Sequence, residues 1–280
     1  MSTAKLLLLG AIAGSTIFVG LPVGRIPRPM PKTRAALNAM AIGILLFLLF
    51  DVLSHANTPV EDALTAAHSG ADSWGRFAWL FVVFIGGLAA GLLSLVYYDR
   101  WLKARTDRTL GPGAATRAEL RPLSFGGWSE AKRLALFIAL GIGLHNFSEG
   151  LAIGQSAANG EVSLAGVLII GFALHNGTEG FGIVAPFAAV DERPSWAFLG
   201  AMGLLGGGPT FVGTLLGNSV VNDTLFLGFL ALAAGSILYV IIQLLKMAQR
   251  FDQPEVLMWG LVAGITLGFA TDYVLVVAGS

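Results

Sequence analysis

The residues best suited to chemistry form a near-repeat, Leu-His-Asn-x-Ser/Thr-Glu-Gly, which occurs twice in the second half of the chain. Each copy places a histidine four residues before a glutamate: His145 precedes Glu149, and His175 precedes Glu179. Residues four apart lie on one face of a helix, one turn apart. Imidazole nitrogen and carboxylate oxygen suit Zn²⁺ and related divalent ions, and four such ligands complete a tetrahedral zinc site. The repeat therefore predicts a metal site.

The spacing of the two copies predicts that they lie at the same depth. His145 and His175 each lie fifteen residues from Gly160, which is part of a polar turn. At about 1.5 Å per residue, each histidine is roughly 22 Å from that turn. A short turn makes the two helices antiparallel neighbours, so their side chains converge near the middle of a bilayer. A carboxylate at this depth costs at least about 2.5 kcal/mol, which a bound cation offsets.

Asn146 and Asn176 follow the two histidines and give the repeat a second pair of polar side chains. Two roles are open to them: they bind the metal directly, or they form hydrogen bonds that fix the histidine and glutamate. Gly150 and Gly180 close the two copies and would let another helix approach closely. In the competing interpretation of the whole repeat, histidine–glutamate hydrogen bonds merely hold helices together.

The composition around the repeat is typical of an integral membrane protein. The chain has 280 residues, of which 55% are hydrophobic and 12% charged. A soluble domain carries about a quarter charged residues. Basic and acidic residues balance at 17 each, which gives no general attraction to nucleic acid. The sequence contains no phosphate-binding loop, so no nucleotide partner is expected. It also contains no cysteine, which excludes thiolate ligands. The lipid bilayer is the expected partner.

The predicted fold class is all-α, a polytopic membrane protein with eight transmembrane helices, because eight apolar windows are long enough to cross a bilayer. Fifteen of the 17 basic residues fall on one side, which the positive-inside rule assigns to the cytoplasm, so both termini are expected outside. We expect one transmembrane domain over 1–280, with a flexible basic cytoplasmic loop over 99–133, in the inner (plasma) membrane. The windows are 6–23, 35–54, 77–98, 134–155, 162–190, 196–216, 225–245 and 256–278.

Three further polar residues lie towards the outer ends of predicted spans. Asp51 is near the outer end of the second span, with His55 four residues later, and Asp272 is in the outer half of the eighth span. One interpretation is an interfacial pair that reaches the headgroups. The other is a relay that hands incoming metal to the deeper site. Asp272 either lines this path or hydrogen-bonds a neighbouring hydroxyl group.

Four features of the sequence resemble the ZIP (Zrt/Irt-like) metal-ion transporters. They are the doubled motif, its place in the fourth and fifth of eight spans, the outer termini and the basic loop after span three. The stretch Gly43–Asp51 is similar to the second span of the bacterial GufA-like branch. The resemblance implies uptake of divalent metal into the cytoplasm through a site between spans four and five. It also implies a homodimer and a sliding, elevator-like alternation of access. The expected substrate is Zn²⁺, with Fe²⁺, Mn²⁺, Co²⁺ and Cd²⁺ as further candidates.

The chain departs from the family pattern in the sixth span. Relatives that hold two adjacent metals use a glutamate there, commonly followed by proline, whereas this chain has Gly208 before Pro209. Two adjacent divalent ions need more carboxylates than the doubled motif supplies. We therefore expect one tightly bound metal per chain.

Other functions are compatible with a His/Glu site in a membrane. Within transport, the alternatives are a metal exporter and a metal/proton antiporter. An intramembrane metalloenzyme is less favoured, because the chain has no His-Glu-x-x-His arrangement and no organised nucleophile. A haem carrier with His145 and His175 as axial ligands is disfavoured by the acidic residues one turn away. The chain is expected not to be an enzyme.

Overall fold

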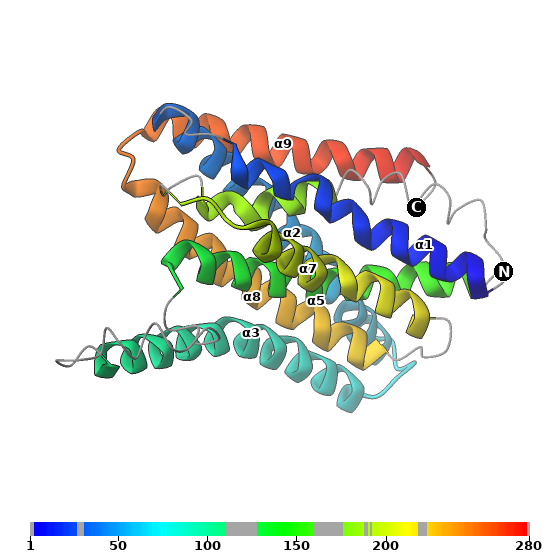
Figure 1. Cartoon of the computed structure of the whole chain (residues 1–280). Coiled ribbons are helices and arrows are strands. Elements are labelled where there is room, and N and C mark those ends of the chain that lie inside the picture. The colour runs from blue at the N-terminus through cyan, green and yellow to red at the C-terminus, as the bar shows by residue number, and fades with distance from the viewer. Residues whose placement is uncertain are drawn as a thin grey trace.

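The computed structural model describes residues 3–26, 31–109, 128–158, 176–187, 190, 192–217 and 223–278. These residues are helical apart from short connections, and none of them forms a strand (Figure 1), which confirms the all-α class. Residues 176–187 form a further helical segment, here called the 176–187 helix. The other elements are α1 (Thr3–Ser15), η1 (Thr16–Val19), η2 (Leu21–Arg25), α2 (Pro31–His68), α3 (Trp74–Thr109), α5 (Glu130–Ala158), α7 (Trp196–Gly217), α8 (Asp223–Gln249) and α9 (Pro254–Ala278).

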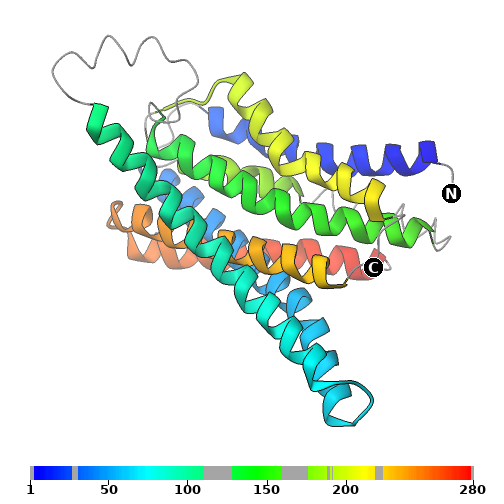
Figure 2. The same ribbon diagram turned by 90° about the horizontal axis from the view of Figure 1, so that it is seen from below.

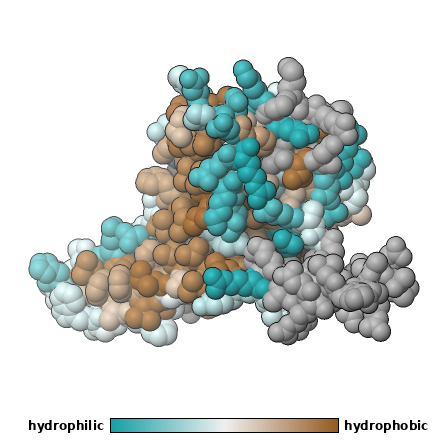
Figure 3. All heavy atoms as spheres, turned by 90° about the vertical axis from the view of Figure 1, so that its left-hand side faces the viewer, coloured by the Kyte–Doolittle hydropathy of each residue, from teal (hydrophilic) through white to brown (hydrophobic). Residues whose placement is uncertain are grey.

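Five described helices, α2, α3, α7, α8 and α9, are long and apolar enough to cross a membrane. The total of eight spans and the outer position of both termini stay predictions. Large apolar side chains such as Trp79, Leu204 and Trp259 are exposed, and apolar surface covers much of the face in Figure 3. Side chains of this kind suit contact with lipid rather than water.

Two of the long helices, α2 and α3, extend well beyond the ends of the spans predicted from the sequence. α2 continues through Pro59, where the sequence predicts a loop, and its turn into α3 projects beyond the other helices (Figure 2). Local polar contacts accompany this stretch: Thr58 Oγ1 donates to the Ser54 carbonyl (3.0 Å) and Asn57 Nδ2 to Glu61 Oε1 (2.7 Å). α3 continues helically to Thr109, the first part of the predicted loop 99–133, whose residues 110–127 lie outside the described part.

Close contacts at glycine divide the helices into two groups. The first group consists of α1 with η1 and η2, α5, the 176–187 helix and α7. An added Cβ on Gly14 of α1 would overlap the Gly207 carbonyl of α7, and one on Gly150 of α5 would overlap the Thr210 carbonyl of α7. A Cβ on Gly180 would overlap the Ile17 carbonyl of η1. Backbones in this group therefore touch directly.

The second group consists of α2, α3, α8 and α9, and it has the same kind of contact. A Cβ on Gly91 of α3 would overlap the Leu232 carbonyl of α8. α2 and α9 run in parallel, because Gly43 meets Gly264 and, one turn later, Phe47 meets Gly268. Small residues at these positions let the helix axes approach closely.

Contacts between the two groups are looser and use side chains. A Cβ on Gly141 of α5 would lie 3.3 Å from Ser236 Cβ of α8, and one on Gly182 would lie 3.9 Å from Leu45 Cδ2 of α2. Among the described glycines, every place where an added Cβ would come within 3.0 Å of a backbone atom lies inside one group. Each group is thus fixed by backbone packing, and the boundary between them by side-chain packing.

Polar contacts at one end add to the first group. Lys132 Nζ of α5 pairs with Glu192 Oε1 before α7 at 2.7 Å. Partial burial raises the pKa of Glu192, but hydrogen bonds from Lys132 and Ser129 outweigh it and leave that pKa below its usual value. Arg25 donates to the Pro194 carbonyl and stacks over the Trp196 ring at 4.8 Å. These contacts tie η2, α5 and α7 together.

We predict that Gly180→Ala lowers thermal stability, because the methyl group would overlap the Ile17 carbonyl, whereas Gly177→Ala in the same helix has open space. Overpacking of this kind costs about 1–3 kcal/mol, while alanine at an open helical position is neutral or favourable by up to about 1 kcal/mol. Thermal unfolding of both variants in detergent is the measurement. Equal midpoints for the two variants would contradict the close packing.

Candidate metal centre

The metal motif is buried between α5 and the 176–187 helix. His145 is 4% exposed and Glu179 is 1% exposed, and Asn146 and Asn176 are fully buried. His145 and Asn146 come from α5, and Asn176 and Glu179 come from the 176–187 helix. The side chain of Glu149 and the whole of His175 lie outside the described residues. Within the described part of the chain, no group of three or more His, Asp or Glu side chains comes together.

His145 and Glu179 face each other across the two helices. His145 Nε2 lies 4.0 Å from Glu179 Oε1, which is longer than a hydrogen bond. Two ligands of a tetrahedral zinc ion, each bonded at about 2.0–2.2 Å, lie roughly 3.4 Å apart. A shift of a few tenths of an ångström in each side chain would therefore bring this pair to bonding distance from one ion.

Asn146 holds the other oxygen of the same carboxylate. Its Nδ2 donates to Glu179 Oε2 at 3.0 Å and to the Gly206 carbonyl of α7 at 3.0 Å. Glu179 Oε2 is thus committed to the amide, while Oε1 faces His145. A hydrogen bond to a carboxylate is stronger than one between neutral groups, which helps to stabilise a charge at this depth.

Asn176 connects the second motif to the first helix. Its Nδ2 donates to the Ala13 carbonyl at 2.9 Å, and Thr16 Oγ1 donates to the same carbonyl at 2.6 Å. Ala13 is in the last turn of α1, after which the chain continues in the short 3₁₀ helix η1. The first span, expected as one continuous helix, therefore changes conformation next to the metal motif.

The part of α7 that faces the site is not apparent from the spacing of residues in the sequence. Gly206 faces Ile17, Ile142 and Ile183, and its carbonyl accepts from Asn146. Position 208 is about 200° further round the helix, and an added Cβ there would meet nothing within 4 Å. The side chain of a glutamate at position 208 would therefore leave the helix on the face that is turned away from the site.

Thr210, one turn after Gly206, is fully buried, and its Oγ1 has no hydrogen-bond partner among the described residues. Two threonines, Thr210 and Thr214, within an otherwise apolar, glycine-rich span are the sequence signal for polar groups at this place. Buried hydroxyl groups usually have a partner, so this oxygen is available to water or to an ion in the site.

The proposed outer relay lies on helices that pack together. His55 Nδ1 is 3.3 Å from Asp51 Oδ1, and the His55 side chain is 64% exposed whereas that of Asp51 is 21% exposed. On the parallel helices α2 and α9, Asp51 and Asp272 both come one turn after the contact between Phe47 and Gly268. The two carboxylates therefore lie at the same level.

The apolar helices define a multi-pass membrane protein. The buried imidazole, carboxylate and amide groups between them are of the types that bind a cation. The sequence model of the family described as ZIP Zinc transporter matches residues 126–275, which is more than half of the chain. The chain belongs to the ZIP zinc transporter family, whose members are transporters rather than enzymes.

Two curated proteins are similar over nearly the full length. A "Zinc transporter ZupT" of Lysinibacillus sphaericus is 26% identical over 275 residues, covering 94% of this chain and 97% of the relative. A protein of the same name from Oceanobacillus iheyensis is 26% identical over 265 residues, with 90% and 93% coverage. The chain is thus a multi-pass membrane protein, located in bacteria in the inner membrane. The GufA-like branch stays a prediction.

We predict that Glu179→Gln lowers zinc affinity at least about tenfold, since it removes a charged oxygen that faces His145. Competition with a zinc-chelating dye on detergent-purified protein measures this. Glu192→Gln is the control, because Glu192 pairs with Lys132 at the end of the bundle and should leave affinity unchanged. Unchanged affinity in Glu179→Gln would remove Glu179 from the site.

Proposed function

We propose that this protein moves Zn²⁺ into the cytoplasm by alternating access, with His145, Glu149, His175 and Glu179 as metal ligands and one tightly bound ion per chain. The observation that carries this proposal is the pairing of His145 with Glu179 across two buried helices, with Asn146 fixing the second carboxylate oxygen. The family and the two ZupT relatives support zinc as the substrate. Fe²⁺, Mn²⁺, Co²⁺ and Cd²⁺ suit the same ligand types.

The two groups of helices support a sliding mechanism. The described residues of the metal motif belong to the first group, which includes α7 and is tied together by backbone contacts at glycine. Side-chain packing between the groups can change register at lower cost than direct backbone contacts. Between α5 and α8, Glu130 and Arg250 form an exposed ion pair at 3.6 Å, which is worth at most about 1 kcal/mol. The first group can therefore carry the ion past the second as one body.

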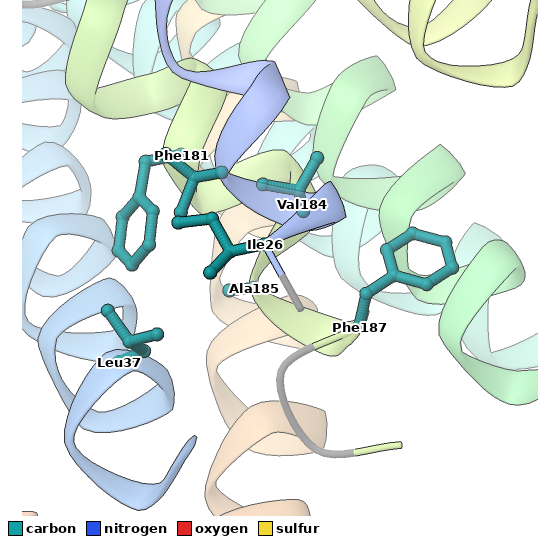
Figure 4. Close-up of a pocket in the computed structure, with 8 residues that line it drawn as sticks. Ile26, Leu37, Phe181, Val184, Ala185 and Phe187 are labelled. Carbon is teal, nitrogen blue, oxygen red and sulfur yellow. The ribbon is translucent and has the colours of Figure 1, made fainter. Parts of the chain in front are cut away.

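The two sides of the motif differ, which supports entry of the ion from the outer side and a barrier on the inner side. On the proposed outer side, His55 is exposed and Asp51 is partly exposed. On the other side, the 176–187 helix continues past Glu179 with apolar residues. Its Phe181 and Ala185 pack with Ala41 and Ile44 of α2. A neighbouring small pocket between η2, α2 and the 176–187 helix (Figure 4) is lined only by apolar residues and a glycine. An ion cannot cross this apolar seal until the groups move.

The proposal is tested by uptake of Zn²⁺, Fe²⁺, Mn²⁺, Co²⁺ and Cd²⁺ into proteoliposomes, with Glu179→Ala as the inactive reference. We expect inward movement down the metal gradient without an organic substrate, and loss of nearly all uptake in the variant. Metal movement that requires a proton gradient in the opposite direction indicates an antiporter. Metal movement only out of the cytoplasmic side indicates an exporter. Hydrolysis of an added substrate without metal movement would contradict transport.

Zinc affinity is expected to fall as pH drops below about 6.5, because a protonated imidazole cannot bind metal. The expected direction follows from the ligand chemistry: neutral histidine, present above its pKa, is the binding form. Zinc titrations between about pH 7.5 and 5.5 measure this dependence. A flat affinity over that range would speak against His145 and His175 as ligands.

The homodimer, which only the resemblance implies, is tested separately by the mass of the detergent-purified complex.

For the outer relay, we propose that Asp51 and Asp272 with His55 concentrate incoming metal. Asp51→Asn and Asp272→Asn should raise the KM for zinc severalfold with little change in the maximal rate, and added salt should reduce the difference. Glu255→Gln, at the other end of α9, is the matched control. A lower maximal rate with unchanged KM would assign the two aspartates a structural role instead.

A further inference from the structure

A small apolar pocket lies at the boundary between the two groups of helices. Its walls come from η2, the following Ile26 and the 176–187 helix of the first group, and from Leu37 of α2 in the second group. Figure 4 shows Leu37 across from Phe181 and Ile26. Phe181 and Val184 are buried, whereas Ile26 is 53% exposed, so the pocket opens to the surroundings beside η2. A pocket lined in this way suits an apolar ligand and not an ion.

The mouth of the pocket lies next to an arginine–tryptophan pair of the kind found where a membrane meets water. Arg25, which precedes Ile26, donates to the Pro194 carbonyl and lies 4.8 Å from the centroid of the Trp196 ring. The Trp196 side chain is 62% exposed. Tryptophan is enriched at the level of the lipid headgroups, and the positive-inside rule assigns this end of the helices to the cytoplasm. We therefore expect the mouth to meet the inner leaflet of the membrane near its headgroups.

Basic side chains flank the mouth on both sides. Lys32 and Arg34 are in the first turn of α2, and Arg34 lies one turn before Leu37 on the same side of that helix. Arg25 of η2 lies on the opposite side of the mouth and keeps its positive charge in its contacts with a carbonyl and a ring. Glu192, close in sequence to Pro194, is engaged in an ion pair of its own. An anionic group at the mouth would therefore meet positive charge.

We propose that this pocket binds an anionic phospholipid of the inner leaflet. Part of one acyl chain enters between η2, α2 and the 176–187 helix, and Lys32, Arg34 and Arg25 attract the phosphate. Basic pockets between transmembrane helices on the cytoplasmic side bind such headgroups. An apolar pocket with a basic rim selects this ligand, because a neutral apolar molecule would not use the charges and a soluble anion would not use the pocket. The site goes beyond the proposed function, since its existence does not depend on which ion is moved.

A chain in this pocket would act on the boundary between the two groups. The pocket has walls on both groups, so sliding would move Leu37 past Phe181 and Val184 and change its shape. A ligand that binds one arrangement better than another shifts the equilibrium towards it. Bound phospholipid would thus stabilise the arrangement described here and slow the sliding movement. This effect on the rate of uptake, unlike the binding itself, rests on the proposed function.

Binding is tested first, on detergent-purified protein and without transport. Dioleoyl phosphatidylglycerol is the anionic probe, and dioleoyl phosphatidylcholine, which has the same acyl chains, is the zwitterionic reference. We expect phosphatidylglycerol to raise the midpoint of thermal unfolding more than the reference does, because a ligand of the native state stabilises it. Native mass spectrometry should show phosphatidylglycerol retained at one molecule per chain.

Variants of the rim locate the site. The double variant Lys32→Gln, Arg34→Gln removes two charges and should weaken phosphatidylglycerol binding at least about tenfold. Ile26→Ser removes the exposed apolar rim and should weaken it about threefold or more. Two variants are the matched controls and should bind as the unsubstituted protein does: Val19→Ser changes an exposed apolar residue of η1, and Lys246→Gln an exposed lysine at the end of α8.

The effect on transport is measured in vesicles. Adding phosphatidylglycerol to phosphatidylcholine vesicles should lower the maximal rate of zinc uptake at least about twofold in the unsubstituted protein, and much less in the double variant. Comparing the two proteins in the same vesicles cancels the effect of the membrane surface charge on the local zinc concentration. Equal rates in the unsubstituted protein with and without phosphatidylglycerol would overturn the coupling to sliding.

Two results would overturn the site itself. One is an equal rise of the unfolding midpoint with both lipids, and the other is equal binding in the rim variants and their controls. Retention of added oleate in place of phosphatidylglycerol would assign the pocket to a free fatty acid and contradict the proposal as well. Failure of the proposed function is recognised separately, as no zinc uptake by the unsubstituted protein in any lipid. The unfolding and mass measurements decide the lipid site in that case too.

Discussion

The Glu179 carboxylate is almost completely buried, and the helices around it must compensate for a charge that water cannot reach. A charge at this depth must be balanced by hydrogen bonds and by a cation, or the helix that carries it would not be stable in a bilayer. Asn146 supplies the hydrogen bond and His145 a neighbouring imidazole.

Glycine makes this arrangement possible, because a short asparagine side chain bridges two helices only where their backbones come close. The contact of Gly150 with α7 and that of Gly180 with η1 bring α7 and α1 within reach of the two amides. The same contacts join the first group of helices into one body. In the proposed mechanism, rigidity around the ion and mobility of the whole group would have one origin: backbone contacts inside the group and side-chain contacts at its boundary.

The two sides of the motif differ in chemistry. Polar residues with exposed atoms, such as His55, lie on the proposed outer side, whereas Phe181 and Ala185 close the inner side against α2. In the proposed mechanism, an ion reaching His145 from the outer side would meet an apolar barrier beyond Glu179. Sliding of the first group would exchange these surroundings without breaking the hydrogen bonds of the motif.

The all-α membrane class, the family, the doubled motif and the close approach at Gly150 and Gly180 could all be predicted from the amino-acid sequence. These properties follow from composition and from spacing along single helices, which fixes what shares a face. The bridge from Asn146 to Glu179 and Gly206, and the orientation of Gly208 away from the site, became visible in the folded bundle alone. The same holds for the end of α1 beside Asn176. Such relations depend on the rotation and register of one helix against another, which packing of the whole bundle sets and local spacing does not encode.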